Sequence, residues 1–320
     1  LDNLVIDETS LRELYPSHLK DIVSYNNNIY SGWLRLLPNS LIWFDISKLN
    51  QYPDVDFTTF ESLINSTKDL ADKNISPWCA NSESGASTGW VQTNWMEDLL
   101  LTTYGPKIYD EWSRLEIGPS NVKIYSVLKD LGNFIFYSSM IENGYQEIFN
   151  KEFRNLPRML LDDNNDCFLS WSGHYFRYYI PEEYKYEKDF GVIKLPSVNY
   201  ENSIVGIGDS LVLVENNEVS ITTMQSLLSK NFGEVWAQKN NSEFISANKN
   251  FDSAFIENSL TSYKFDITHD ALKNDMFRYD ASEIMARPIG ANLLWKMLID
   301  YIRQGPESLV RLLNELDKEI

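Results

Sequence analysis

The sequence of 320 residues is poor in histidine and cysteine and has no long apolar run. Its 3 histidines, His18, His174 and His269, are far apart, and neither Cys-x-x-Cys nor His-x-x-x-His occurs, so no zinc motif is present. No apolar run approaches the ~20 residues that a membrane-spanning helix needs. Gly206-Ile-Gly208 lacks the third glycine of a dinucleotide loop, and no Gly-x-Ser-x-Gly segment occurs. We therefore expect no metal and no cofactor.

Positive charge is also scarce. The chain has 28 Lys and Arg residues against 46 Asp and Glu residues, which gives a net charge of −18. Binding to phosphates requires a basic surface, so this balance disfavours a nucleic-acid partner. The excess of acidic residues mainly favours solubility.

The chain contains only two cysteines, Cys79 and Cys167. The residues alone leave two alternatives open, because two buried thiols in a chain of this size need not react. A disulfide that closes so long a loop is worth ~4–5 kcal/mol in the chain-entropy model. It would also require an oxidising compartment.

Strand-like and helix-like apolar patterns alternate along the chain, which favours an α/β fold. No long Pro- or Gly-rich linker divides the sequence, so two lobes would have to be interleaved. The predicted strands are Ser40–Phe44, Cys167–Trp171, Gly191–Leu195 and Ile204–Val214, and the predicted helices are Thr58–Asn74, Trp90–Tyr104, Asn121–Asn143, Thr222–Lys239 and an amphipathic segment that contains Leu309, Leu312, Leu313 and Leu316.

Aromatic residues make up 13% of the chain, with 9 Trp and 18 Tyr. Three clusters, 87–95, 170–175 and 277–295, combine Trp with short polar or charged residues. A sugar presents alternating C–H and O–H surfaces, which aromatic rings and hydrogen-bonding side chains bind together. The clusters therefore indicate a carbohydrate-binding protein, although each single Trp is more often a core residue. A glycoside hydrolase is the alternative, but no motif marks its pair of carboxylates.

Several segments occur in the order and spacing of a known family. They run along nearly the whole chain and are Tyr15-Pro16, Ser40-Leu-Ile-Trp-Phe44, Pro77-Trp-Cys79, Thr88-Gly-Trp-Val-Gln-Thr-Asn-Trp-Met-Glu-Asp98, Tyr104-Gly-Pro106, Gly206-Ile-Gly-Asp209 and Phe277-Arg-Tyr-Asp-Ala-Ser-Glu-Ile-Met285. In these segments the chain resembles bacterial ABC-transporter extracellular solute-binding proteins of the maltose and α-glucoside type.

The resemblance implies an α/β two-lobe periplasmic-binding-protein fold with interleaved lobes, hinge crossovers and a ligand cleft between the lobes. Residues 1–38 would be the remainder of the N-terminal lobe, 39–203 the main part of the C-terminal lobe, 204–262 a return to the N-terminal lobe, and 263–320 the helices that close the cleft. Family members carry a further part of the N-terminal lobe ahead of the point where this chain begins. We therefore expect that part to be missing from this chain.

The family's function implies a receptor rather than an enzyme. The chain would bind an α-glucoside-type sugar, such as sucrose, trehalose or glucosylglycerol, and deliver it to ABC permease subunits. The resemblance also implies a monomer at a periplasmic or extracytoplasmic location, with any lipid anchor outside this chain. Both cysteines match cysteines of the α-glucoside subgroup, so a Cys79–Cys167 disulfide is expected. A sugar-binding adhesin without a transport role is a further alternative.

Carried over position by position, the resemblance implies no catalytic residue and a set of ligand-binding residues. Two departures from the family, Asn94 in place of Asp and Ala286-Arg287 in place of Pro, bear on which sugar is bound. The implied ligand-binding residues are Arg35, Trp90, Asn94, Trp95, Trp171, His174, Asp209, Arg278, Asp280 and Trp295.

Overall fold

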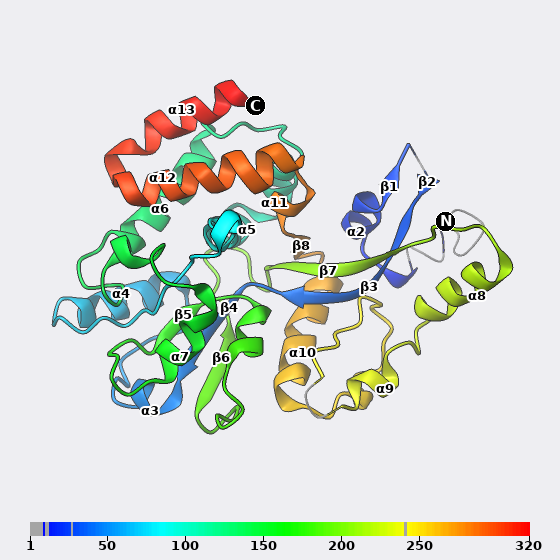
Figure 1. Cartoon of the computed structure of the whole chain (residues 1–320), viewed down its shortest axis with the longest axis horizontal. Helices are drawn as coiled ribbons and strands as arrows, with labels where there is room; N and C mark the ends of the chain where they lie inside the picture. The colour runs from blue at the N-terminus through cyan, green and yellow to red at the C-terminus, as the bar shows by residue number, and fades with distance from the viewer. Residues whose placement is uncertain (1–8, 10–12, 27, 240–241) are drawn as a thin grey trace. The chain divides into compact units, whose positions relative to one another are not determined.

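The computed structural model describes residue 9 and residues 13–26, 28–239 and 242–320. The chain divides into two compact units, which Figure 1 shows with their labelled elements. Unit 1 comprises Leu1–Pro38 and Gly206–Tyr279, and unit 2 comprises Asn39–Val205 and Asp280–Ile320. The chain therefore passes from one unit to the other three times, and the predicted interleaved two-lobe α/β organisation is confirmed.

The observed boundaries differ from the predicted ones, mainly at the third crossover. It lies between Tyr279 and Asp280 rather than between residues 262 and 263. Helix α10 (Ser259–Lys273) continues across the predicted boundary, and strand β8 (Phe277–Tyr279) then joins the sheet of unit 1. The second crossover lies at 205/206 instead of 203/204. Apolar patterns do not reveal which sheet a three-residue strand joins, because that choice depends on pairing partners distant in sequence.

Unit 1 is built on a sheet of order β3-β7-β8, in which β3 (Ser31–Pro38) and β7 (Ile204–Val212) are antiparallel. Gly206 and Gly208 permit this pairing, since a Cβ at these positions would lie 2.6 Å and 2.4 Å from carbonyl oxygens of β3. The other elements of unit 1 among the described residues are α2 (Ser17–Ile22), β1 (Ser24–Tyr25), β2 (Asn28–Ile29), α8 (Glu218–Leu227), α9 (Glu234–Ala237) and η5 (Ser253–Phe255).

The single helix predicted over Thr222–Lys239 is wrong, because two short helices, α8 and α9, occupy this region. The break between them contains Gly233 in a left-handed conformation with φ 93°. A Cβ at Gly233 would lie 2.1 Å from the Phe244 ring, so this glycine lets the backbone approach the small apolar core of unit 1. Tertiary packing therefore overrides helix propensity in this segment.

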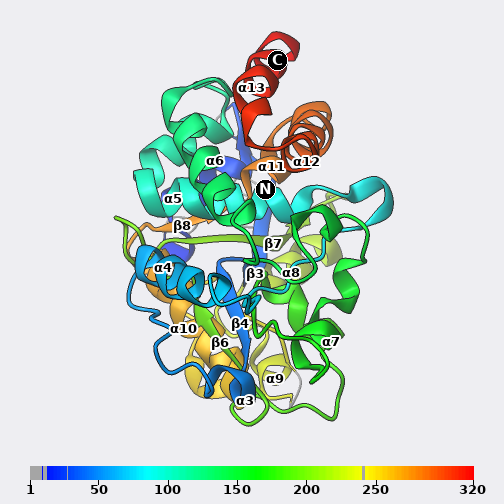
Figure 2. The same ribbon diagram turned by 90° about the vertical axis from the view of Figure 1, so that its left-hand side faces the viewer.

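Unit 2 contains an antiparallel sheet of order β5-β4-β6, and Figure 2 shows β4 and β6 side by side. Strand β4 (Leu41–Asp45) is central, and β5 (Leu169–Trp171) and β6 (Phe190–Lys194) flank it. All three strands lie within one residue or two of the predicted segments. All three residues of β5 are buried, so β5 lacks the alternation of buried and exposed residues that is typical of half-exposed strands. The pattern that predicts this strand is therefore a short apolar run.

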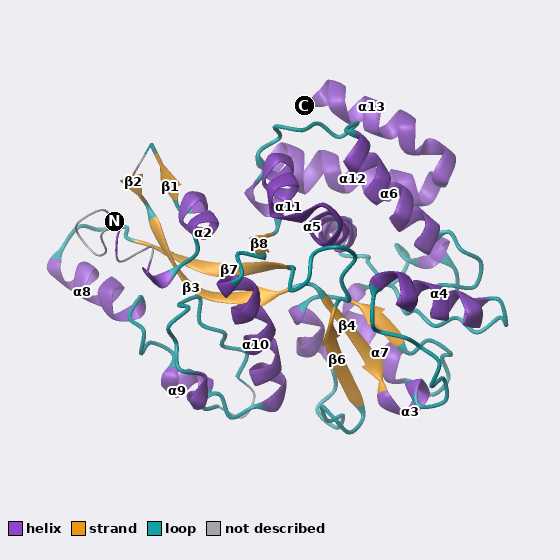
Figure 3. Cartoon of the chain, turned by 180° about the vertical axis from the view of Figure 1, so that it is seen from behind, coloured by secondary structure: helices purple, strands orange, loops and turns teal. Residues whose placement is uncertain are grey.

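Helices make up most of unit 2, as Figure 3 shows by colour. Helix α4 begins after Thr59, whose hydroxyl accepts a hydrogen bond from the Ser62 amide in a capping box. The predicted stop at Gly105-Pro106 is a break within α5, where two helical stretches meet at a kink, since Gly105 has the non-helical angles φ 78° and ψ 178°. The main helices are α4 (Phe60–Ala71), α5 (Trp90–Ser113), α6 (Val122–Ile135), α12 (Trp295–Gln304) and α13 (Leu309–Glu319), and the shorter ones are α3 (Ile46–Leu49), η1 (Gly85–Ser87), η2 (Tyr145–Glu147), η3 (Phe153–Asn155), α7 (Leu156–Leu161), η4 (His174–Tyr179), α11 (Ala281–Ile284), the π-helix η6 (Ile289–Leu294) and η7 (Pro306–Ser308).

The predicted disulfide and the predicted last helix are both confirmed. Cys79 and Cys167 form a disulfide with an S–S distance of 2.05 Å, and both residues are buried in unit 2. The apolar stripe of α13 is buried, and α13 packs against α12 and α6. These contacts join the C-terminal segment of the chain to the core formed by residues 39–205.

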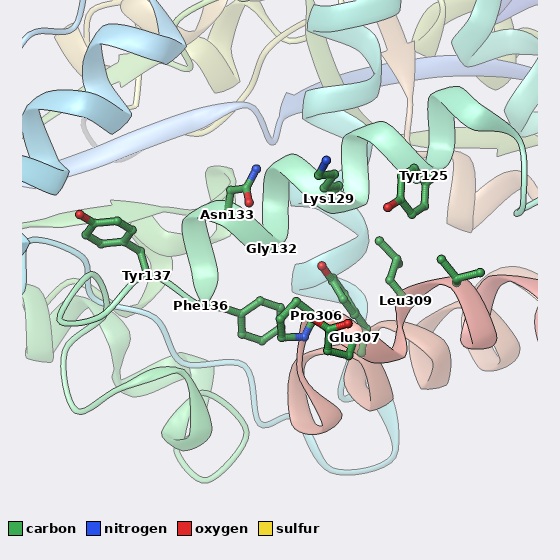
Figure 4. A pocket seen from close by; sticks show the side chains of 11 residues that line it. Tyr125, Lys129, Gly132, Asn133, Phe136, Tyr137, Pro306, Glu307 and Leu309 are labelled. Carbon is green, nitrogen blue, oxygen red and sulfur yellow. The ribbon is translucent and has the colours of Figure 1, made fainter.

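A hollow of about 410 Å³ lies on unit 2 between α6 and the turn that joins α12 to α13 (Figure 4). Gly132 of α6 and Tyr301 of α12 are among its lining residues. A Cβ at position 132 would lie 2.1 Å from the Tyr301 hydroxyl oxygen, which donates a hydrogen bond to the Leu128 carbonyl at 3.1 Å. Glycine is therefore needed for the close contact between these two helices.

We expect Gly132→Ala to lower the free energy of unfolding by about 1–3 kcal/mol, because the added methyl displaces a buried ring. The ~1 kcal/mol that Ala would gain in helix propensity opposes this loss. Chemical denaturation of both proteins measures the difference. The same substitution in a Tyr301→Phe background should cost less, since the colliding oxygen is gone. An equal loss in both backgrounds would show that the Tyr301 hydroxyl is not the cause.

Candidate functional site

Five of the predicted ligand-binding residues lie at the ends of elements of unit 2. Trp90 opens α5 and Asn94 follows one turn later, while His174 opens η4. Asp280 is the N-cap of α11 and Trp295 opens α12. Residues at the ends of rigid elements are well placed to contact a ligand, because the element fixes the side chain.

Aromatic rings meet around Trp90. Its ring centroid lies 4.6 Å from that of Tyr175 and 5.2 Å from that of Phe153, with interplanar angles of 76° and 84°. Both contacts are edge-on, and Trp90 stays partly exposed. The site prediction missed Tyr175 and Phe153. The sequence did carry a signal for Tyr175, because it directly follows His174 in an aromatic and polar cluster.

Polar groups accompany these rings. The His174 Nδ1 atom lies 3.2 Å from the Asn39 side-chain oxygen. Asn94 is 4% exposed, and its Oδ1 atom has no hydrogen-bond partner among the described residues; the same holds for the buried Nε1 atom of Trp295. A buried polar atom without a partner costs about 1–3 kcal/mol, so such atoms call for an explanation, and a polar ligand supplies one.

Two glycines set the position of Trp295. Gly89 has φ 116°, and a Cβ there would lie 2.7 Å from the Cβ of Trp295. Gly290 lies against α11, where a Cβ would be 2.0 Å from the Ser282 carbonyl oxygen. The start of α12 is therefore fixed against the loop before α5 and against α11 by contacts that only glycine allows.

Trp95 and Trp171 lie deeper in unit 2. Their rings stack at 5.9 Å with an interplanar angle of 28°, and the residues are 4% and 2% exposed. The Trp95 indole donates to the Trp171 carbonyl at 2.8 Å, and the Trp171 indole donates to the Asp98 carboxylate at 2.7 Å. Both rings thus pack against protein, and a ligand contact by either one stays a prediction.

The other three predicted residues belong to unit 1. Arg35 and Asp209 form an ion pair across β3 and β7, and the Arg35 guanidinium lies 5.4 Å from the ring centroid of Trp236. Arg278 is 5% exposed, and its NH1 atom donates to the carbonyls of Phe277 and Asp275 at 2.8 Å and 3.0 Å. These bonds give Arg278 a structural role at the junction of α10 and β8, so a ligand contact by Arg278 also stays a prediction.

A group of buried carboxyls in unit 2 was not predicted. Glu97 and Asp98 on α5 and Asp280 before α11 are each less than 5% exposed. Burial raises the pKa of Asp98 to about 7 and that of Asp280 to about 6, against the opposing effect of hydrogen bonds that each accepts. The sequence signal was two adjacent acids inside the apolar run Trp95–Leu101, a position where charged residues rarely occur without partners.

These carboxyls form no metal centre. Within residues 13–26, 28–239 and 242–320, no three His, Cys, Asp or Glu side chains gather in a way that could hold a metal ion. In the same described part of the chain, no helix has both the length and the apolar character required to cross a membrane.

Comparison with known sequences gives no match to a family model. The chain is 26% identical over 98% of its length to the osmoprotective compounds-binding protein GgtB of Synechocystis sp. PCC 6803, and it spans 73% of that protein. It is 24% identical over 88% of its length to the α-glucosides-binding periplasmic protein AglE of Rhizobium meliloti, of which it spans 62%.

Solved structures share the fold across almost the whole chain. The bacterial solute receptor AcbH, described as having an exclusive preference for β-D-galactopyranose, aligns with 97% of this chain and 77% of its own at a TM-score of 0.76 and 12% identity. Maltose-bound MalE3 of T. maritima aligns with all of this chain and 80% of its own at a TM-score of 0.66 and 12% identity. The chain is therefore similar along nearly its whole length to sugar- and osmoprotectant-binding solute-binding proteins of ABC transporters, which are binding proteins rather than enzymes.

Proposed function

We propose that the protein binds an α-glucoside-type sugar, either a disaccharide such as sucrose or trehalose or a glucosyl compatible solute such as glucosylglycerol. The names of GgtB and AglE support this class of ligand. The observation that carries the proposal is a group of three side chains on unit 2. The partly exposed Trp90 ring lies beside Tyr175, and Asn94 follows Trp90 in the next turn of α5.

The chemistry of this set suits a sugar. The ring of Trp90 can stack on the C–H face of a pyranose, which is worth something like the ~0.5–1.5 kcal/mol measured for aromatic pairs. The Asn94 Oδ1 atom can accept a bond from a sugar hydroxyl, and the Trp295 Nε1 atom can donate one. Asp280 supplies a carboxyl, which can form a hydrogen bond with a sugar hydroxyl. Together these groups match the alternating surfaces of a sugar.

We also propose that the protein acts outside the cytoplasm as a monomer and delivers its ligand to ABC permease subunits. The Cys79–Cys167 disulfide supports an oxidising compartment, because disulfides are rare in the cytosol. The periplasmic location given in the name of AglE agrees with this assignment.

Titration calorimetry with sucrose, trehalose, maltose and glucosylglycerol tests the proposal. We expect saturable binding of at least one of them in the micromolar range or tighter. Trp90→Ala should weaken that binding about tenfold or more, because it removes both the stacking face and the packing of Tyr175. Tyr25→Ala is the matched control, since Tyr25 is an exposed aromatic residue of unit 1 outside the predicted site.

Two results would contradict this proposal. The first is an absence of saturable heat with every sugar of the panel. The second is an unchanged affinity of Trp90→Ala for the sugar that the wild type binds, which would move the ligand away from this part of unit 2.

A further inference from the structure

Two adjacent acids of α5, Glu97 and Asp98, accept hydrogen bonds from residues of unit 2 that lie next to the three crossovers. At the first two crossovers, the Ser40 hydroxyl donates to the Asp98 carboxylate and accepts from the Val205 amide at 2.8 Å. The Asn39 amide donates to the Val205 carbonyl at 2.8 Å, which ties the same two segments together. Asp98 thereby fixes the chain where it enters unit 2 after Pro38 and where it leaves it after Val205.

Glu97 holds the third crossover. Its Oε2 atom accepts from the Ala281 amide at 2.9 Å and from the Tyr109 hydroxyl at 2.9 Å. Its Oε1 atom accepts from the Ser282 amide at 3.0 Å. One carboxyl therefore binds two consecutive backbone amides of the first turn of α11, immediately after the chain returns to unit 2 at Asp280.

The bonds from this turn continue into the proposed ligand site. The Asp280 carboxyl accepts from the Ser282 hydroxyl at 2.7 Å and from the Glu283 amide at 3.2 Å. The Ser282 hydroxyl also lies 3.4 Å from the Thr93 hydroxyl, one residue before Asn94 on α5. A shift of the turn relative to Glu97 would therefore move Asp280 and Ser282 relative to Asn94.

We propose that Glu97 is a positioning residue for sugar binding, which fixes the Asp280–Ser282 turn against α5 so that the Asp280 carboxyl meets the ligand. This inference rests on the proposed function. Glu97 is fully buried and lies under the turn, so it acts through Asp280 and Ser282 rather than by touching the sugar.

The proximity of Glu97 and Asp280 makes the arrangement depend on pH. Burial, followed by the charge of Asp280, raises the pKa of Glu97 well above its usual range. Besides burial, Glu283 on α11 raises the pKa of Asp280, and bonds from Ser282 and Glu97 lower it. The other titratable groups that face these two acids are Tyr109 and Asp98 on α5 and Tyr175 at η4.

The sign of the effect follows from these pKa shifts. Both acids bind protons more tightly in the folded protein than in free solution, so the uncharged arrangement is complete at acidic pH and is lost as the pH rises through about 6, the pKa of Asp280. Ionised Asp280 disfavours the ionisation of Glu97, and once both are ionised the two carboxylates repel each other and disturb the turn. Sugar affinity should therefore fall between about pH 5 and about pH 8.

Glu97→Gln tests this role without opening a cavity. The neutral amide removes the titration of Glu97 and its repulsion of Asp280, and its NH2 group cannot accept from the Ser282 amide, so one bond to the turn is lost. By titration calorimetry against the sugar that the wild type binds, we expect an affinity about tenfold weaker at about pH 5. We also expect this affinity to change less between about pH 5 and about pH 8 than that of the wild type, because no second carboxylate faces Asp280. Glu111→Gln, the same substitution at a partly exposed position of α5 beyond the kink at Gly105, should retain the wild-type affinity and pH profile.

Three results would overturn the inference, and they are distinguishable. If the wild type binds no sugar, the proposed function fails and this inference fails with it. If the wild type binds but Glu97→Gln keeps both its affinity and its pH profile, only the positioning role fails. If Glu97→Gln lowers the denaturation midpoint without changing affinity or pH profile, Glu97 is merely structural.

Discussion

Removal of the Cys79–Cys167 disulfide is expected to lower the free energy of unfolding of unit 2 by about 3–5 kcal/mol. The bond joins residues 88 positions apart, so without it the unfolded chain regains the conformational freedom of a long loop. Both cysteines lie in the core beside the sheet, where the Cys79 amide donates to the Leu169 carbonyl at 2.8 Å. The double variant Cys79→Ala/Cys167→Ala removes the bond without burying a new polar group.

Urea denaturation followed by tryptophan fluorescence measures this loss. Of the 9 tryptophans all but Trp33 and Trp236 belong to unit 2, so the signal mainly reports on that unit. A reductant should destabilise the wild type to a similar extent and leave the double variant unchanged, which serves as the control. Equal denaturation midpoints for the oxidised wild type and the double variant would contradict the prediction.

Trp171→Ala is expected to destabilise unit 2 by about 3–5 kcal/mol, the usual cost of truncating a large buried aromatic residue. The Trp171 ring contacts the rings of Trp95, Phe60 and Phe134 at centroid distances of 5.9 Å, 5.7 Å and 6.3 Å. The variant also leaves the buried Asp98 carboxyl without its 2.7 Å bond from the indole. The loss of packing and the loss of this bond act in the same direction.

Trp171→Phe separates these two effects, because it keeps an aromatic ring but removes the indole N–H. We expect it to cost about 1–3 kcal/mol, mainly from the unpaired carboxyl. Denaturation and sugar titration of both variants give the comparison. A Trp171→Ala variant with normal stability and greatly weakened sugar binding would show that the Trp171 ring contacts the ligand, as the resemblance implied.

Much of the fold could be predicted from local patterns. The apolar stripe of α13 and the cap of α4 at Thr59 follow from spacing and from hydrogen bonds within one turn, so they need no distant partner. The break between α8 and α9 could not be predicted, because the Phe244 ring that requires Gly233 comes from a later segment. Likewise, the position of the third crossover depends on β8 pairing with β7, which the sequence around residue 277 does not encode by itself.

The candidate site shows the same division. The residue types in the segments around Trp90, His174 and Asp280 indicated sugar chemistry before any contact was known. The sequence could not decide whether a given Trp stacks on a ligand or packs in the core. Trp90 and Trp95 belong to the same sequence cluster, but only Trp90 stays partly exposed. The buried acids Glu97 and Asp98 were missed because the groups they bind, Ser40 and the first turn of α11, are distant in sequence.

The sequence by itself indicated the resemblance to solute-binding proteins, the α/β character, the interleaving of the two units and the candidate side chains for binding a sugar. These properties depend on periodicity, on residue type and on the order of motifs, all of which are local. Only the tertiary structure decided the third boundary, the core role of Trp95 and Trp171, and the meeting of three crossovers at Glu97 and Asp98. Burial and long-range hydrogen bonding are properties of pairs of distant segments, and they exist only once the chain has folded.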